Sequence, residues 1–404
     1  MMTPRAIRLA AAFGLLWSGI AAAQPSSSEP IKIGWIGHLT GVLSAYGQDM
    51  LRAAEMAVED INASGGVHGR KLQLVVRDDR GDPSQAATLV RELDTQERVL
   101  VVSGSMSADV SKALRGYAES NQIPYISASS GDASLTAPGT KWTQRVQPPA
   151  AVQGAAMAKF ALSRKPDAKL AILRHDILYF PEVMNGALWY AEKFGQAKIV
   201  YNQYFPPRQA DFNVVAAQLK EAQPDYILFA FNPPGLENFT RAVLASGFRP
   251  DQIICFTVQT APAQRALGKD IIGTYAATFF DESLRQILPE AGVLSDRFFA
   301  GRGYYPGYIV GNAYGTVRMI AAAAEASRSA SRPDFEKALR SEELSSASGE
   351  KVRFDDSGRN TLNTVYIVQA VAFDEKRLAT FALRDTIRFD LSEVPDLELS
   401  KARK

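Results

Sequence analysis

Short apolar runs alternate along the chain with longer segments in which apolar residues recur every three or four positions. The run Ile31–Ile36 predicts a strand, and the spacing of apolar residues within Ala45–Ala63 predicts a helix with one buried face. Further apolar runs predict strands at Lys71–Val76, Val99–Val102, Pro124–Ile126, Leu170–Leu173, Ile199–Tyr204, Tyr226–Phe229, Ile253–Phe256, Gly273–Phe280 and Val365–Ala372. Helical spacing between these runs predicts helices at Pro83–Gln96, Ala108–Ser120, Ala150–Leu162, Pro181–Phe194, Phe212–Ala222, Leu236–Ser246, Glu290–Arg302 and Ile309–Ser327.

The regular alternation of strands and helices determines the predicted fold class. Repeated strand–helix units with apolar strands predict parallel sheets that helices cover on both faces. The predicted strands exceed the number in a typical open sheet, so we expect an α/β protein with two doubly wound parallel-sheet lobes. Two adjacent prolines in Thr143–Pro149 predict a crossover between the lobes, and the helices after Phe280 predict a return to the first lobe.

The first 23 residues have the order of segments found in a secretory signal. Arg5 and Arg8 precede an apolar run at Leu9–Ile20, and three consecutive alanines end at Ala23. The apolar run is shorter than the roughly 20 residues of a membrane-spanning helix. We therefore predict a signal peptide at residues 1–23, cleavage after about Ala23, and export of the remaining chain.

Composition and charge exclude several classes of protein. The chain of 404 residues is 46% hydrophobic and 22% charged, which is typical of a folded globular protein. Its 45 basic and 43 acidic residues nearly balance, so a nucleic-acid partner is not expected. Cys255 is the single cysteine, which excludes an internal disulfide and a thiolate zinc site.

The sequence offers few groups for catalysis. Three histidines, His38, His68 and His175, are the available proton shuttles near neutral pH. The segment Gly104–Ala108 lacks the second glycine of a hydrolase nucleophile elbow, and the chain has no phosphate-binding loop motif. We interpret the adjacent acids Asp78–Asp79 as solvated turn caps. We therefore predict no metal site, no cofactor and no enzymatic activity.

Small polar residues follow the first, third and fourth predicted strands, in the position where open parallel sheets bind ligands. These segments are Gly37–Tyr46, Ser103–Ala108 and Ser127–Gly131. Serine, glycine and alanine leave backbone N–H groups open at a helix start, where the helix dipole favours an anion. A bound carboxylate fits this chemistry, and ordinary turns are the alternative interpretation.

Three stretches of the chain have the residue pattern of a known family. They are Ile31–Ala86, Ile123–Thr136 and Val352–Arg359. In these stretches the chain resembles the type I periplasmic substrate-binding proteins of ABC importers, in the leucine/isoleucine/valine-binding group. The resemblance covers nearly the whole chain after the predicted signal peptide. It implies two lobes that are joined by three crossovers and close around a small molecule.

The resemblance also implies boundaries, a partner and a location. Lobe one would comprise residues 31–148 and 278–352, and lobe two would comprise residues 149–277 and 353–404. The partner would be a small-molecule ligand and then a membrane permease of an ABC importer, and the location would be the periplasm. We expect a monomer.

Four positions of lobe one match ligand-binding positions of the family. The residue at the start of the helix after the third strand matches Ala108 or its neighbour Ser107, and two residues after the fourth strand match Ser129 and Gly131. In the family these positions hold the carboxylate and ammonium of the ligand. An aromatic residue that covers the ligand matches Tyr46. Gly131 stands where amino-acid binders place a threonine, so one polar contact is missing here.

Lobe two would supply a second aromatic residue, which matches Phe180 or the adjacent Tyr179. Core packing is the alternative for these aromatic residues. The family also supplies an acid from lobe two at a position near Val258, yet no Asp or Glu occurs between Asp251 and Asp270. A buried ammonium without a partner would be costly.

The missing acid determines the predicted ligand class. We expect a small carboxylate with an apolar or aromatic body, rather than an α-amino acid, to bind by hinge closure. His38 is interpreted as a surface or capping residue, with a polar ligand contact as the alternative. Three other functions stay open: binding of a branched-chain amino acid whose ammonium pairs with Glu237, an enzyme, and a sensory module without transport.

Overall fold

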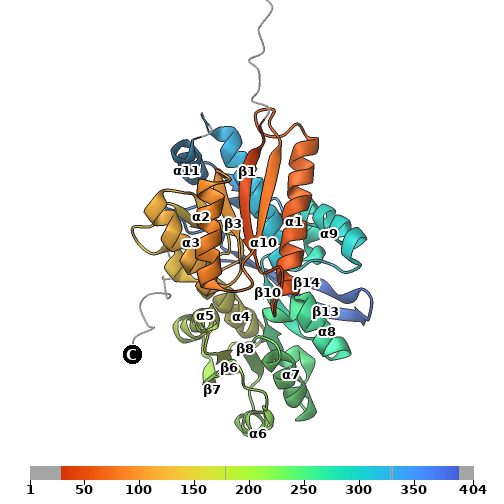
Figure 1. Ribbon diagram of the computed structural model, residues 1–404. Helices are drawn as coiled ribbons and strands as arrows, with labels where there is room; N and C mark the ends of the chain where they lie inside the picture. Colours follow the sequence, from red (N-terminus) through yellow and green to blue (C-terminus); the bar gives the residue numbers. More distant parts are fainter. Residues whose placement is uncertain (1–28, 178, 328, 330, 391–404) are drawn as a thin grey trace, which may run out of the picture.

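The computed structural model describes residues 29–390 apart from residues 178, 328 and 330. The predicted signal peptide and the tail after residue 390 lie outside this part of the chain. Figure 1 shows two lobes, an upper one built mainly from the N-terminal third and a lower one built mainly from the middle of the chain. Of the helices in the described residues, none combines the length and the apolar character needed to cross a membrane.

The upper lobe contains a parallel sheet of five strands in the order β2-β1-β3-β4-β5. The strands are β1 (Ile31–Gly37), β2 (Leu72–Asp78), β3 (Val101–Gly104), β4 (Tyr125–Ser127) and β5 (Thr143–Arg145). The connections contain α1 (Ser44–Ala63), α2 (Pro83–Thr95), α3 (Ala108–Asn121) and the 3₁₀ turn η1 (Ala133–Thr136). Trp35 and Ile36 of β1 pack into cores on opposite faces of the sheet, which is why this strand is apolar throughout.

The lower lobe contains a mixed sheet of seven strands in the order β14-β13-β10-β9-β8-β6-β7. The strands are β6 (Lys169–His175), β7 (Lys198–Phe205), β8 (Tyr226–Ala230), β9 (Ile253–Cys255), β10 (Tyr275–Thr278), β13 (Thr364–Asp374) and β14 (Leu378–Arg388). The helices are α4 (Ala150–Arg164), α5 (Tyr179–Phe194), α6 (Asn213–Ala222), α7 (Gly235–Ala245) and α8 (Ala261–Leu267). The first five strands are parallel, whereas β13 and β14 pair antiparallel at one edge.

After β10 the chain returns to the upper lobe and forms three helices and a small hairpin. They are α9 (Pro289–Arg302), α10 (Tyr308–Ala326), α11 (Arg332–Ser341), β11 (Leu344–Ser345) and β12 (Lys351–Val352). Helix α10 packs along α1. Arg297 of α9 forms an ion pair with Glu59 of α1 at 2.6 Å, and the His68 ring contacts the Ala324 carbonyl at 3.1 Å.

The chain thus passes between the two sheets three times, after β5, after β10 and after β12. The first and third crossovers lie side by side. The Arg145 amide donates a hydrogen bond of 2.9 Å to the Gly358 carbonyl, and the Asn360 side chain donates to the Val146 carbonyl. These bonds join two of the three connections into one ribbon between the lobes.

The predicted fold class, two doubly wound α/β lobes, is confirmed, but three details of the element prediction were wrong. The start of the predicted crossover is the buried strand β5, whose polar side chains donate hydrogen bonds to acids: the Thr143 hydroxyl donates to Glu119 at 2.7 Å, and Gln144 donates to Glu336. Helix α11 and strand β14 were not predicted. The antiparallel pair β13–β14 also makes the second sheet mixed rather than wholly parallel.

Candidate functional site

The carboxyl ends of β1, β3 and β4 lie at the edge of the upper sheet that faces the lower lobe (Figure 1). Helix α3 begins at this edge with Ala108, and the Ser107 hydroxyl caps it by accepting a hydrogen bond of 3.5 Å from the Val110 amide. The first N–H groups of a helix have no partner within the helix. The helix start that the sequence analysis predicts as an anion site lies at this edge, with Ser107 as its cap.

Ser129 and Gly131 follow β4 at the same edge. Ser129 is 8% exposed, and its hydroxyl has no hydrogen-bond partner within the described part of the chain. The Gly131 carbonyl accepts a hydrogen bond from the buried Arg145 guanidinium. This contact fixes the backbone that carries the predicted ligand-binding position.

Tyr179 of the lower lobe packs directly on Gly131. A Cβ atom on Gly131 would lie 2.0 Å from the Cε2 atom of the Tyr179 ring, so only glycine leaves room for this contact. The Tyr179 hydroxyl accepts a hydrogen bond of 2.8 Å from the Gln147 amide and donates one of 2.8 Å to Gln153. The structure therefore brings together two of the predicted site residues from opposite lobes.

The two glutamines extend this contact toward the crossovers. Gln147, in the first crossover, accepts a hydrogen bond of 2.9 Å from Asn312 of α10. Gln153 of α4 donates one of 2.7 Å to the Ala277 carbonyl near the end of β10. Tyr179 is thereby connected through buried amides to two of the three connections between the lobes.

Tyr46, at the start of α1, lies close to residues of the lower lobe. Burial raises the pKa of the Tyr46 phenol, the Thr260 hydroxyl lowers it, and the Glu237 carboxylate raises it. One oxygen of Glu237 is buried and has no hydrogen-bond partner among the residues that the structure describes. An acid of the lower lobe is thus near the predicted aromatic cover of the ligand.

Phe180 and Phe256 form an aromatic cluster with Tyr179. Phe180 and Tyr179 pack edge-on against Phe256, with ring centroids 5.4 and 5.6 Å apart. Burial raises the pKa of Tyr308 well above its usual value, and the neighbouring Tyr179 and Tyr46 add to the shift. Tyr179, Phe180 and Phe256 therefore form an aromatic wall on the lower lobe, and Tyr308 of α10 lies near it from the upper lobe.

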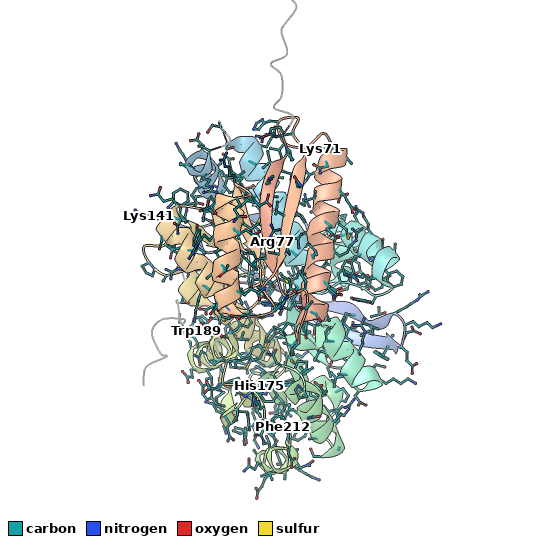
Figure 2. The ribbon with its side chains drawn as sticks, viewed as in Figure 1. Lys71, Arg77, Lys141, His175, Trp189 and Phe212 are labelled. Atoms are coloured by element: carbon teal, nitrogen blue, oxygen red, sulfur yellow. The ribbon has the colours of Figure 1, made fainter. Side chains whose placement is uncertain are left out.

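His175, at the end of β6, belongs to the aromatic core beneath this wall (Figure 2). Its ring stacks on Phe231 at 4.5 Å, and its Nδ1 accepts a hydrogen bond of 3.2 Å from the Asn232 amide. Burial lowers the pKa of His175 to about 4. The imidazole is therefore neutral near pH 7 and places no positive charge behind the cleft.

Comparison with family models gives a match to the periplasmic binding protein model over residues 30–376. The chain belongs to the periplasmic binding protein family. This confirms the family that the sequence resembles.

Similar proteins with known names include a Leu/Ile/Val-binding protein of Escherichia coli K12, which is 29% identical over 241 residues. That match covers 60% of this chain and 64% of the relative, so somewhat less than two thirds of the relative is matched. A solute-binding protein of R. palustris, solved in complex with 4-hydroxybenzoate, has a TM-score of 0.77 and 21% identity over 92% of this chain and 100% of that one. A leucine-binding protein of Thermotoga maritima has a TM-score of 0.74 and 22% identity, over 89% of this chain and 99% of that one.

The predicted position Val258 lies in the apolar core of the second lobe of this periplasmic binding protein. Val258 is fully buried in that core. Its neighbour Gln259, which ends the 3₁₀ turn η3 (Thr257–Gln259), is 1% exposed. Neither amide atom of Gln259 has a hydrogen-bond partner in the described residues. Gln259 is thus the polar residue of the loop after β9.

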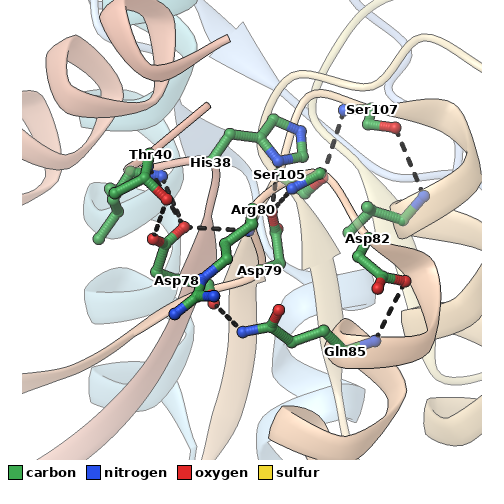
Figure 3. Close-up of polar contacts among 12 residues, drawn as sticks. His38, Thr40, Asp78, Asp79, Arg80, Asp82, Gln85, Ser105 and Ser107 are labelled. Atoms are coloured by element: carbon green, nitrogen blue, oxygen red, sulfur yellow. Dashed lines mark hydrogen bonds and ion pairs between the residues drawn. The ribbon is translucent and has the colours of Figure 1, made fainter. Parts of the chain in front are cut away.

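The interpretation of His38 and Asp79 as exposed caps was wrong for this binding protein. His38 is 1% and Asp79 0% exposed, and the His38 Nδ1 atom contacts the Asp79 carboxylate (Figure 3). Asp79 also accepts a hydrogen bond of 2.7 Å from the Gly81 amide. The pair lies at the carboxyl ends of β1 and β2, where it joins two loops beneath the cleft. Asp78, in contrast, does cap a turn, by accepting hydrogen bonds from residues of the loop after β1.

Sequence reasoning did not find four polar or aromatic residues of this site. They are Gln147, Gln153, Gln259 and Tyr308. The glutamines carried a usable signal, since each interrupts a segment of apolar or small residues in which a buried amide needs a partner. Tyr308 carried no such signal. It begins a helix of the first lobe about 130 residues after Tyr179, so no local pattern relates the two residues.

Proposed function

We propose that this periplasmic binding protein is an exported receptor that captures a small organic carboxylate with an apolar or aromatic body and delivers it to the permease of an ABC importer. The observation that carries the proposal is the contact between the Gly131 backbone and the Tyr179 ring. This contact brings an anion-binding backbone and an aromatic wall within reach of one small molecule.

Lobe one would hold the carboxylate. The open N–H groups at the start of α3, near Ser107 and Ala108, and the unpaired Ser129 hydroxyl are donors at one edge of the sheet. Each hydrogen bond to a charged group contributes about 1.5–3 kcal/mol. Two or three such bonds are enough to orient a small acid.

Lobe two would cover the body of the ligand. Tyr179 and Phe180 supply aromatic faces, and Tyr46 covers the ligand from the lobe-one side. The loop after β9 is neutral, because no Asp or Glu occurs between Asp251 and Asp270. A ligand ammonium would lose its hydration there without gaining a charged partner from this loop. The R. palustris relative, solved with 4-hydroxybenzoate, is consistent with a ligand of this class.

Binding would proceed by population shift between open and closed states. In this proposal lobe one comprises residues 31–148 and 278–352, and lobe two comprises residues 149–277 and 353–404. The three crossovers between them act as the hinge. A ligand held by lobe one gains the contacts with Tyr179 only after closure, so it favours the closed state.

A second candidate is a branched-chain amino acid, and one observation favours it. Glu237 lies near Tyr46 and has a buried oxygen without a partner in the described part of the protein. This carboxylate would pair with a ligand ammonium in place of the missing acid. The E. coli and T. maritima relatives are named for leucine and similar amino acids.

A thermal-shift screen of the protein without residues 1–23 separates the two candidates. The screen compares leucine, isoleucine and valine with benzoate, 4-hydroxybenzoate and aliphatic acids that lack the amino group. A ligand at about 100 times its Kd adds about 2.7 kcal/mol of apparent stability. We expect a shift with the simple acids alone. A shift with leucine that disappears in Glu237→Gln, and persists in the control Glu221→Gln, would replace the proposal by the second candidate.

A further inference from the structure

Gln259 is a buried side chain that the fold itself does not satisfy. Only 1% of its surface is exposed, and neither Oε1 nor Nε2 has a hydrogen-bond partner among the described residues. Buried amides in proteins are almost always paired, because an unpaired one loses its hydration without compensation. Such an exception, in a loop that residues of both lobes enclose, points to a ligand that supplies the partner.

Hydrogen bonds fix the rest of the loop around Gln259. The Gln259 carbonyl accepts a hydrogen bond of 2.7 Å from the Gln264 amide, and Gln264 in turn accepts one of 2.8 Å from the Ala379 backbone. The Thr257 hydroxyl donates one of 3.1 Å to the Phe231 carbonyl. The backbone position of Gln259 is thus fixed, and only its side-chain amide is left unpaired.

The surroundings place the turn that carries Gln259 at the boundary of the lobes. Val258 points into the core of lobe two, and successive residues of a 3₁₀ turn leave in directions about 120° apart. Thr260, the next residue, lies near Tyr46 of lobe one. A Cβ atom on Gly307, just before the returning helix α10, would lie 3.1 Å from the Gln259 carbonyl. The turn is therefore enclosed by residues of both lobes.

We propose that Gln259 determines specificity by binding a hydroxyl group of the ligand outside its carboxylate. The inference rests on the proposed function. A hydroxyl donates one hydrogen bond and accepts another, and it therefore satisfies both Oε1 and Nε2 of the amide. An ammonium group has only donors and leaves Nε2 unpaired, and a methyl group leaves both atoms unpaired. The ligand class is thereby narrowed to hydroxylated carboxylates.

Isothermal titration calorimetry with matched acids tests this inference. The pairs are benzoate with 4-hydroxybenzoate, and phenylpropionate with its para-hydroxy derivative. For at least one pair we expect wild-type protein to bind the hydroxylated acid about tenfold more tightly or better, because the amide stays unpaired with the other acid. In Gln259→Leu this preference should disappear, mainly through weaker binding of the hydroxylated acid.

A control and a second variant make the outcome decisive. Gln196→Leu changes an exposed glutamine of the same lobe and should keep the wild-type preference. If Gln259→Leu does not fold, Gln259→Met keeps an unbranched side chain of similar length, and the same loss of preference is expected. The inference is overturned if simple and hydroxylated acids bind wild-type protein equally, or if the folded variants keep the preference. If none of these acids binds, the carboxylate proposal fails as well.

Discussion

The upper lobe meets the cleft with serine, glycine and the open start of a helix, whereas the lower lobe meets it with tyrosine, phenylalanine and glutamine side chains. The first set, represented by Ser129 and Gly131, offers directional donors on a backbone that strands fix in place. The second set, represented by Tyr179 and Gln259, offers shape and one neutral polar group. In the proposed function, this difference would assign recognition of the carboxylate to one lobe and of the rest of the ligand to the other.

The largest effect is expected where the two sets touch. In Gly131→Ala, the new Cβ would lie 2.0 Å from the Tyr179 ring, so the ring must move before the lobes can close. Backbone strain is not the cause, since Gly131 does not have a positive φ. Overpacking costs about 1–3 kcal/mol, which corresponds to a loss of affinity of up to about a hundredfold.

Titration calorimetry with the acid found in the screen measures this loss. The matched control is Gly116→Ala on α3, where a Cβ atom would meet no atom within 4 Å and the helix should be slightly stabilised. If Gly131→Ala binds as tightly as wild type, the contact between the lobes does not belong to the ligand-bound state.

A smaller effect is expected at the aromatic cover on the lobe-one side. Tyr46→Ala removes a half-buried ring that faces residues of the lower lobe. We expect binding to weaken by about ten- to thirtyfold, because the ring would bury apolar surface of the ligand worth about 1.5–2 kcal/mol. The midpoint of thermal unfolding without ligand should change little. Equal losses of stability and affinity would instead assign Tyr46 to the core, and Tyr46→Phe should retain most of the binding.

A still smaller effect is expected from the Tyr179 hydroxyl. Tyr179→Phe keeps the ring against Gly131 but leaves the Gln147 and Gln153 amides each without one partner. Each buried amide that loses a partner lowers the free energy of unfolding by about 1–3 kcal/mol. We expect thermal unfolding at a lower temperature and an affinity within about tenfold of wild type. A normal melting temperature would show that the glutamines find other partners.

The smallest effect on ligand binding is expected at the joint between the lobes, where the expected change is a dependence of stability on pH. Burial raises the pKa of Asp281 to about 7, against opposing hydrogen bonds from Ser283. The unfolded chain loses this proton at about pH 4, so the native state holds more protons between about pH 4 and 7 and the free energy of unfolding falls as the pH rises. Relative to wild type, Asp281→Asn should therefore gain stability between pH 5 and 8.

Thermal unfolding at several pH values measures this difference. The control is Asp374→Asn, because hydrogen bonds from the amides of Arg377 and Lys376 lower the pKa of Asp374. The contribution of Asp374 is lost only as the pH falls below its ordinary range. The Asp374 variant should show no added slope between pH 5 and 8, and a slope as large as that of Asp281→Asn would contradict the assignment.

The periodicity of apolar residues was sufficient to predict the two sheets and most of their helices. Periodicity failed to predict β5, because this strand buries polar residues such as Thr143 and Gln144. Their side chains donate hydrogen bonds to acids of other elements. It also overlooked α11, although Phe335, Ala338 and Leu339 have helical spacing after the capping Ser331.

The parts of the candidate site that follow from strand order could be predicted from the sequence. The parts that depend on contacts between the two lobes could not. The open start of α3 follows from the rule for parallel sheets. The His38–Asp79 pair could also have been found, since Gly37 and Asp78 are partners in the parallel register of β1 and β2. The contact of Tyr179 with Gly131 joins separate lobes, and no local pattern in either segment specifies it.

The hydrogen bonds between the first and third crossovers affect how fast a ligand is released. Twisting one lobe against the other would break the hydrogen bonds from Arg145 to Gly358 and from Asn360 to Val146. Bending both crossovers together would preserve these bonds. The lobes therefore separate along a single preferred coordinate. The residence time of a ligand would then depend on how fast the lobes open, so substitutions that weaken these two bonds should change the rates of ligand binding and release.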